Sequence, residues 1–179
     1  MSALTRRWIE QFVIAENLCP FAAPVLRQNQ LCIAVNEAHD DRELALSVLD
    51  ELELMQRAPE AELATSVLVF PHTLQDFERY LDFVALAEEL LEACELDGIV
   101  QIASFHPQYC FADAAVDDVS NFTNRAPFPM LHFLRESALT RVLDNYPEPE
   151  AIPQRNIDHL QALGLEQVKL RLAKIHAGT

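Results

Sequence analysis

Two histidines and one arginine are the residues of this chain best suited to chemistry. His72 and His106 each follow a short apolar run, and Arg125 stands beside Asn124 just before a predicted helix. A neutral histidine can accept a proton, and an arginine with an amide and free helix N–H groups can bind a carboxylate or phosphate. We therefore predict that His106 and His72 are acid–base groups and that Arg125 and Asn124 clamp an anion.

Three further residues complete the predicted substrate-binding set. Tyr109 follows His106 closely, while His132 and Arg135 come a few residues after Arg125. His132, Arg135 and Glu136 are spaced three and four residues apart, which places them on one face of a predicted helix. His132 and Glu136 could instead form a hydrogen-bonded pair that faces the preceding loop and has no role in binding.

The same residues support other interpretations. His72 and His106 could bind a metal together with a carboxylate such as Asp118. Spacing does not establish that site, so we predict no metal ligand and name no cofactor. Each histidine could also be a hydrogen-bonded residue of its turn, and Arg125 could pair with an aspartate of residues 113–118 to hold the loop closed.

The cysteines and glycines offer little chemistry. Cys19 is expected at the C-terminus of the first helix, where the helix dipole raises the pKa of a thiol, so it is not predicted to be a nucleophile. We expect reduced thiols at all four cysteines: Cys19, Cys32, Cys94 and Cys110. Only three glycines occur, which argues against a glycine-built phosphate loop.

Alternating strands and helices must position these residues. Apolar runs at 31–35, 66–70 and 99–105 predict strands buried on both faces, and helical spacing predicts crossovers over 41–57 and 74–95. Such an alternation favours a parallel sheet, in which ligands bind beyond the carboxyl ends of the strands. The functional predictions depend on these three strands running in one direction.

The remaining segments add helices and one long loop. Apolar residues three or four apart predict four more helices, over 4–17, 129–145, 151–163 and 165–176. Residues 106–128 lack periodicity but contain aromatic anchors, so we expect an ordered functional loop, with a possible fourth strand over 109–113. The fold class is therefore a single α/β domain over 1–179, in which five or six helices cover a three- to four-stranded, mostly parallel sheet.

Charge excludes several classes of partner. The chain has 13 basic against 28 acidic residues, a formal net charge of −15, which repels nucleic acid and anionic lipid. No stretch approaches the roughly 20 apolar residues of a membrane span, and no signal peptide is recognised. We expect a cytoplasmic protein that binds neither nucleic acid nor membrane, and we make no prediction of its oligomeric state.

Three segments resemble a family of bacterial proteins, domain-of-unknown-function family 1415. They are Leu18-Cys19-Pro20-Phe21-Ala22, residues 103–109 with His106-Pro107, and residues 123–136 with Asn124-Arg125-Ala126-Pro127. The resemblance covers residue 4 to about 164, so the tail over 165–179 lies outside it. It implies a shared fold and no activity, cofactor or catalytic residue. Asp113-Ala114-Ala115-Val116 departs from the Gly-Thr-Ala-Pro-like turn expected there.

Three functions are therefore considered. The first is an enzyme or binding protein for a small anionic metabolite at the carboxyl edge of the sheet, which requires His106 and Arg125 to open into a common cavity. The second is a metal-dependent enzyme with histidine and carboxylate ligands. The third is a non-catalytic interaction protein with an exposed apolar patch, for which the tail helix is the candidate.

Overall fold

Four strands form one sheet in the order β1-β2-β4-β3 in the computed structural model, which describes residues 1–144 and 146–178. β1 (Leu31–Val35) and β2 (Thr65–Val69) are parallel, while β4 (Met130–Arg135) lies antiparallel between β2 and β3 (Val100–Phe105). β1, β2 and β3 thus point the same way, as the functional predictions require. Only one neighbouring pair is parallel, however, so the sheet is mixed and the prediction of a mostly parallel sheet is wrong.

The strand β4 lies where the sequence predicts the first half of a helix over 129–145. The chain instead forms β4 and passes without a turn into α5 (Glu136–Leu143). Because β4 is a central strand, both of its faces are buried, and its apolar run fits a helical stripe as well as a strand. The fourth strand is therefore here and not over 109–113, which lies in the loop.

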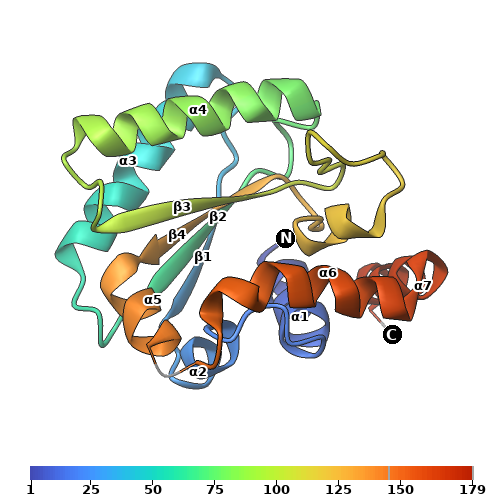
Figure 1. Ribbon diagram of the computed structural model, residues 1–179. Coiled ribbons are helices and arrows are strands. Elements are labelled where there is room, and N and C mark those ends of the chain that lie inside the picture. The colour runs from blue at the N-terminus through green and yellow to red at the C-terminus, as the bar shows by residue number, and fades with distance from the viewer. Residues whose placement is uncertain (145, 179) are drawn as a thin grey trace.

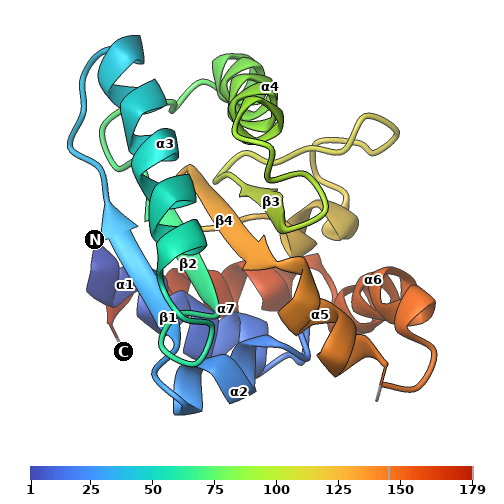
Figure 2. The same cartoon turned by 90° about the vertical axis from the view of Figure 1, so that its left-hand side faces the viewer.

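Helices cover both faces of the sheet (Figures 1 and 2). One face carries α3 (Asp41–Arg57) and α4 (Phe77–Ala93), which begin where the side chains of Asp40 and Asp76 accept hydrogen bonds from backbone N–H groups of the first turn. The other face is covered by segments from both ends of the chain: α1 (Ser2–Trp8), the π-helix η1 (Ile9–Ile14), α2 (Ala22–Arg27), α6 (Ile152–Leu163) and α7 (Leu165–Ala177).

Short helical segments complete the described chain. The 3-10 helices η2 (Val119–Thr123) and η3 (Pro149–Ala151) lie in the long loop and before α6. α7 confirms the predicted tail helix, and Gly164, with φ 80°, separates it from α6. None of the described helices combines the length and apolar composition that a membrane crossing needs.

The first helix differs from its prediction in kind. The segment predicted as one helix over 4–17 is α1 continued by η1, in which the backbone takes the wider π-helical form. Asn17, in the left-handed region with φ 54°, then ends the helix before Cys19. π-Helical turns are rare in proteins, but those that occur are often part of a functional site. The side chains of η1 therefore mark a region to search for a site.

Candidate functional site

The carboxyl ends of β1 and β2 meet at one edge of the sheet, as predicted. Nε2 of His72, which follows β2, lies 2.9 Å from a carboxylate oxygen of Glu37, which follows β1. The His39 ring is 6.3 Å from the His72 ring, measured between centroids. The His72 and Glu37 side chains are both largely exposed, so this pair lies on the surface.

His106, the stronger sequence candidate, is fully buried at the end of β3. Its Nδ1 accepts a hydrogen bond from the Gln108 N–H at 3.0 Å, so the ring proton is on Nε2, which donates to the Leu74 carbonyl at 3.0 Å. The ring also packs against Phe77 and Tyr80, and burial lowers its pKa. Both ring nitrogens are thus held by backbone groups, which fixes the turn into the long loop.

Arg125 also serves the loop. Its Nε donates to the Tyr109 carbonyl at 3.1 Å, its Nη2 donates to the Val116 carbonyl at 2.6 Å, and its guanidinium lies 4.4 Å from the centre of the Phe122 ring. Burial lowers the pKa of Arg125. Among the described residues it forms no ion pair with the aspartates of residues 113–118, so the loop is closed through carbonyl groups.

Asn124 holds the loop to β3. Its Nδ2 donates to the Ser104 carbonyl at 3.1 Å, and its own carbonyl accepts from the His106 N–H at 3.2 Å. Residues 106–128 are accordingly an ordered, packed loop, as predicted. His106 has no accessible surface, so the common cavity with Arg125 that the anionic-metabolite hypothesis requires is not formed.

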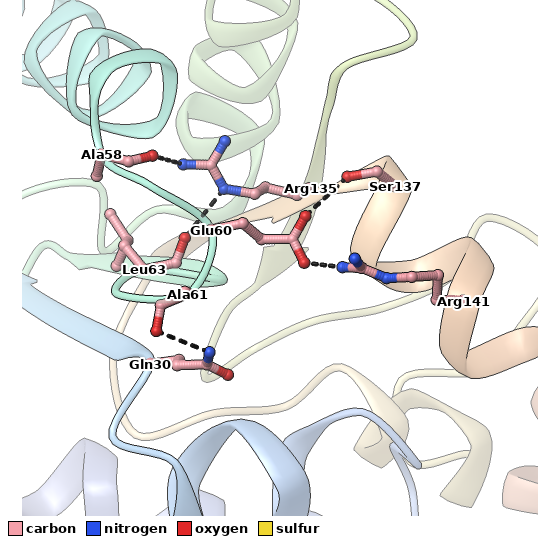
Figure 3. A network of polar contacts seen from close by, with 8 residues as sticks. All are labelled: Gln30, Ala58, Glu60, Ala61, Leu63, Arg135, Ser137 and Arg141. Carbon is pink, nitrogen blue, oxygen red and sulfur yellow. Dashed lines mark hydrogen bonds and ion pairs between the residues drawn. The ribbon is translucent and has the colours of Figure 1, made fainter.

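Arg135 lies at the opposite end of the sheet, because β4 runs against the other three strands. Its Nε donates to the Leu63 carbonyl at 2.9 Å and its Nη2 to the Ala58 carbonyl at 2.6 Å, which fastens the connection between α3 and β2 (Figure 3). In the same network Glu60 accepts from Ser137 and pairs with Arg141. The predicted binding set is therefore divided between the two ends of the sheet.

His132 faces a cavity of about 70 Å³ between the sheet and the N-terminal helices. The cavity, which we call the inner cavity, is lined by Trp8, Cys19, Thr65, Phe105, Met130 and His132, together with apolar side chains of η1, α2, β1 and β2. The predicted helix face shared by His132 and Glu136 does not exist, because His132 is in a strand. Residues of the N-terminal helices and of all four strands line the inner cavity instead.

The hydrogen bonds of Thr65 fix the tautomer of His132. The Thr65 hydroxyl donates its single hydrogen to the Phe133 carbonyl at 2.6 Å, so the 2.6 Å contact between Thr65 Oγ1 and His132 Nε2 is donated by the ring. Nδ1 of His132 then carries a lone pair, and no described residue donates to it. Burial lowers the pKa of His132 to about 4, which keeps the ring neutral at pH 7.

Cys19 lines the inner cavity from the turn before α2. The backbone N–H groups of Phe21 and Ala22 stabilise its thiolate, but burial has the larger effect and raises the pKa of the thiol. The predicted direction is therefore found, although burial and not a helix C-terminus is its main cause. At pH 7 the inner cavity presents a neutral thiol and a neutral imidazole.

Trp8 forms another part of the wall. Its Nε1 is buried and has no hydrogen-bond partner among the described residues, and its ring contacts the Phe105 ring edge-on with centroids 5.5 Å apart. Neither Trp8, Thr65 nor Phe105 is singled out by sequence, because none belongs to a motif. Their shared feature is a place around one cavity, which only the fold creates.

The described residues provide no set of ligands for the metal-dependent hypothesis. Among residues 1–144 and 146–178, no three histidine, cysteine, aspartate or glutamate side chains are placed to share a metal ion. His106, one of the proposed ligands, already uses both ring nitrogens.

Fold and cavity together define an α/β protein with a mixed four-stranded sheet and a small internal cavity on one face. A family model described as a protein of unknown function, DUF1415, matches residues 1–170, and the chain belongs to this family. The match continues past Gly164, so the first part of α7 belongs to the family, and the expected end near residue 164 was too early. No curated protein and no solved structure matches the chain.

Proposed function

We propose that this protein binds a small uncharged molecule in the inner cavity, with Nδ1 of His132 accepting a hydrogen bond from it. The observation that carries the proposal is a neutral ring with one free nitrogen in a wall that is otherwise largely apolar. Ligand sites commonly combine an apolar lining with a few polar groups that fix orientation. The π-helix η1, which contributes Ile9 and Val13 to the lining, supports the same location.

The lining favours an uncharged ligand. Among the described residues, no aspartate, glutamate, lysine or arginine side chain lines the inner cavity. An ion moved there would lose its hydration without gaining an opposite charge, which costs several kcal/mol or more. One water occupies on the order of 10–15 Å³ of such a cavity, so a cavity of about 70 Å³ accepts a small group.

Two isosteric five-membered rings test the proposal. Pyrrole carries an N–H donor and furan does not, and the only tryptophan of the chain, Trp8, reports on the inner cavity by fluorescence. We expect both rings to change the Trp8 emission, with pyrrole binding about fivefold more tightly, the equivalent of one neutral hydrogen bond.

His132→Phe should abolish the preference for pyrrole, because it retains an aromatic ring but removes the acceptor. His72→Phe, which changes an exposed histidine, is the matched control and should leave the preference unchanged. Equal affinity for both rings in the unmodified protein, or no response of Trp8, would contradict the proposal.

A second candidate function is the binding of a small anionic metabolite at another site. Arg125, Lys169 and His176 line one groove of about 280 Å³, which is a notable convergence of basic side chains in a chain of net charge −15. Lys169 is exposed, with its only described ion pair 3.7 Å long. His72 and His106 do not line this groove, so anion binding without catalysis is what we propose there.

The two lysines of the chain provide the test of this second function. Lys169 lines the groove, whereas Lys174 lies on the same helix outside the lining. Titration with inorganic phosphate, followed by NMR, should shift the Arg125 backbone resonance, and Lys169→Ala should weaken binding severalfold while Lys174→Ala does not. Equal effects of the two variants would indicate non-specific attraction and reject the site.

A further inference from the structure

The groove of about 280 Å³ between the long loop and α7, which we call the basic groove, has two kinds of lining. Its α7 side consists of Lys169, Leu172 and His176, which are three and four residues apart and so share one face of the helix. Its loop side includes Phe122 and Arg125. Among the described residues, no aspartate or glutamate side chain lines it. Its volume lies just below the roughly 300–1,000 Å³ of common small-molecule sites, so its ligand is small.

The loop fixes the guanidinium of Arg125 before any ligand binds. Nε and Nη2 donate to the Tyr109 and Val116 carbonyls at 3.1 and 2.6 Å, and the guanidinium carbon lies 4.4 Å from the centre of the buried Phe122 ring. Nη1, in contrast, donates to no described residue. A donor that is already held in place loses little conformational freedom when it binds a ligand, which favours affinity.

The basic side chains suit a phosphate group better than a carboxylate. A carboxylate pairs most strongly with two parallel N–H groups of one guanidinium, and the loop already occupies the Nε–Nη2 edge of Arg125. A phosphate monoester has three terminal oxygens that accept hydrogen bonds. Arg125 on one side of the basic groove and Lys169 and His176 on the other provide donors for them.

The rest of the lining is apolar and rigid. Phe122 belongs to a buried cluster, Leu172 packs against that cluster, and Pro107, Ala126 and Pro127 complete the apolar surface. Inorganic phosphate would leave this surface in water. A phosphate attached to an apolar ring would cover it, and the removal of both apolar surfaces from water would add to the affinity.

We infer that the ligand of the basic groove is a small phosphate monoester whose organic part is an apolar ring, with the phosphate at Arg125 and Lys169 and the ring against Leu172. This inference rests on the anion binding proposed for this groove as the second candidate function. It adds the chemical class of the whole ligand.

Three small anions test the inference. Phenyl phosphate carries both predicted groups, methyl phosphate carries the same charged group without a ring, and benzoate carries the ring with a carboxylate. The Arg125 backbone N–H and the Leu172 methyl groups report binding by NMR. We expect phenyl phosphate to shift both, to bind about fivefold to tenfold more tightly than methyl phosphate because part of the ring leaves water, and to bind more tightly than benzoate.

Two leucines of α7 supply the matched variants. Leu172→Ala should remove the advantage of phenyl phosphate over methyl phosphate and leave the affinity for methyl phosphate unchanged. Leu170→Ala, at an exposed position outside the lining, should preserve the advantage. The same loss of advantage in both variants would show that the ring does not bind in the basic groove.

The unmodified protein decides the inference even if Leu172→Ala loosens α7. If methyl phosphate shifts Arg125 but phenyl phosphate binds no more tightly, the inference is overturned and the proposed anion binding stands. An affinity for benzoate that equals or exceeds that for phenyl phosphate would overturn the assignment of a phosphate group. If neither phosphate shifts Arg125, the inference and the second candidate function both fail.

Discussion

The two faces of the sheet differ in how their interiors are filled. Under α3 and α4 one large cluster of buried apolar side chains, including Phe133 and Leu131, fills the space. On the other face two smaller clusters meet, and the inner cavity lies between them. A cavity forfeits dispersion contacts, so a face that keeps one gives up stability that the close-packed face retains. We infer that the first face holds the fold and that the second accommodates a ligand.

The buried residue His106 and the cavity residue His132 differ in the same way. Both ring nitrogens of His106 bind backbone groups, whereas the His132 ring donates from Nε2 to Thr65 and its Nδ1 has no donor among the described residues. A neutral ring nitrogen that carries a lone pair can accept a hydrogen bond from a ligand, which the closed ring of His106 cannot do. Sequence favours His106 of the two, and the contacts favour His132.

The largest expected effect compares two phenylalanines on opposite faces. Phe133→Ala, on the close-packed face, should lower the free energy of unfolding by about 3–5 kcal/mol. Phe105→Ala should cost about half of that, because Phe105 is partly accessible and already borders a cavity. Urea unfolding of both variants measures the difference. An equal or greater loss at Phe105 would reject the contrast between the faces.

The next effect is a dependence of stability on pH that His132 causes. Its pKa is about 4 in the folded state against 6.5 in the unfolded chain, so the unfolded state binds more protons between these values. Stability contributed by the neutral ring is complete above pH 6.5 and falls by about 3 kcal/mol as the pH decreases to 4. His132→Phe should lack this component in urea unfolding across that range. Parallel curves for both proteins would show that the ring protonates freely.

A smaller effect concerns the long loop over residues 106–128. Arg125→Lys retains the charge but loses the geometry of the two hydrogen bonds to the Tyr109 and Val116 carbonyls, and it should cost about 1–2 kcal/mol. Amide hydrogen exchange should accelerate within residues 109–118. Arg27→Lys, at an exposed position, is the control. Unchanged exchange in that segment would mean that the loop does not depend on Arg125.

The smallest effect, that of Ala22→Val, sharpens the comparison between the faces directly. Ala22→Val adds two carbons toward the inner cavity and should stabilise the fold by about 0.5–1 kcal/mol while it weakens pyrrole binding. Ala87→Val makes the same change on the close-packed face, where overpacking should destabilise by about 1–3 kcal/mol. Thermal unfolding of the two variants should move in opposite directions. Destabilisation by both would show that the cavity has no room for the added carbons.

Local patterns predicted most of the fold. β1 and α3 have the predicted bounds, because a short apolar run and a capped amphipathic helix are local signals. β4 was missed since a central strand shows no alternation, and its apolar residues continue into those of α5. That single error also placed His132 and Arg135 on one helix face. Both residues lie instead in β4, and Arg135 at its end binds the connection between α3 and β2.

The candidate site was less predictable than the fold. His132 was selected as a binding residue, but on a helix face with Arg135 and Glu136 that the structure replaces with β4. The other wall residues carry no signal in the sequence, because Trp8, Thr65 and Phe105 become neighbours only when β4 inserts between β2 and β3. A site formed by distant segments needs the strand order, which local periodicity does not contain.

The most direct test of the account is the protonation of the His132 ring, observed by nitrogen NMR with and without pyrrole. We predict a neutral ring at pH 7 with the proton on Nε2, and an Nδ1 resonance that moves when pyrrole binds. A proton on Nδ1, or an Nδ1 resonance that pyrrole leaves unchanged while Trp8 responds, would contradict the claim that this nitrogen is the acceptor of the site.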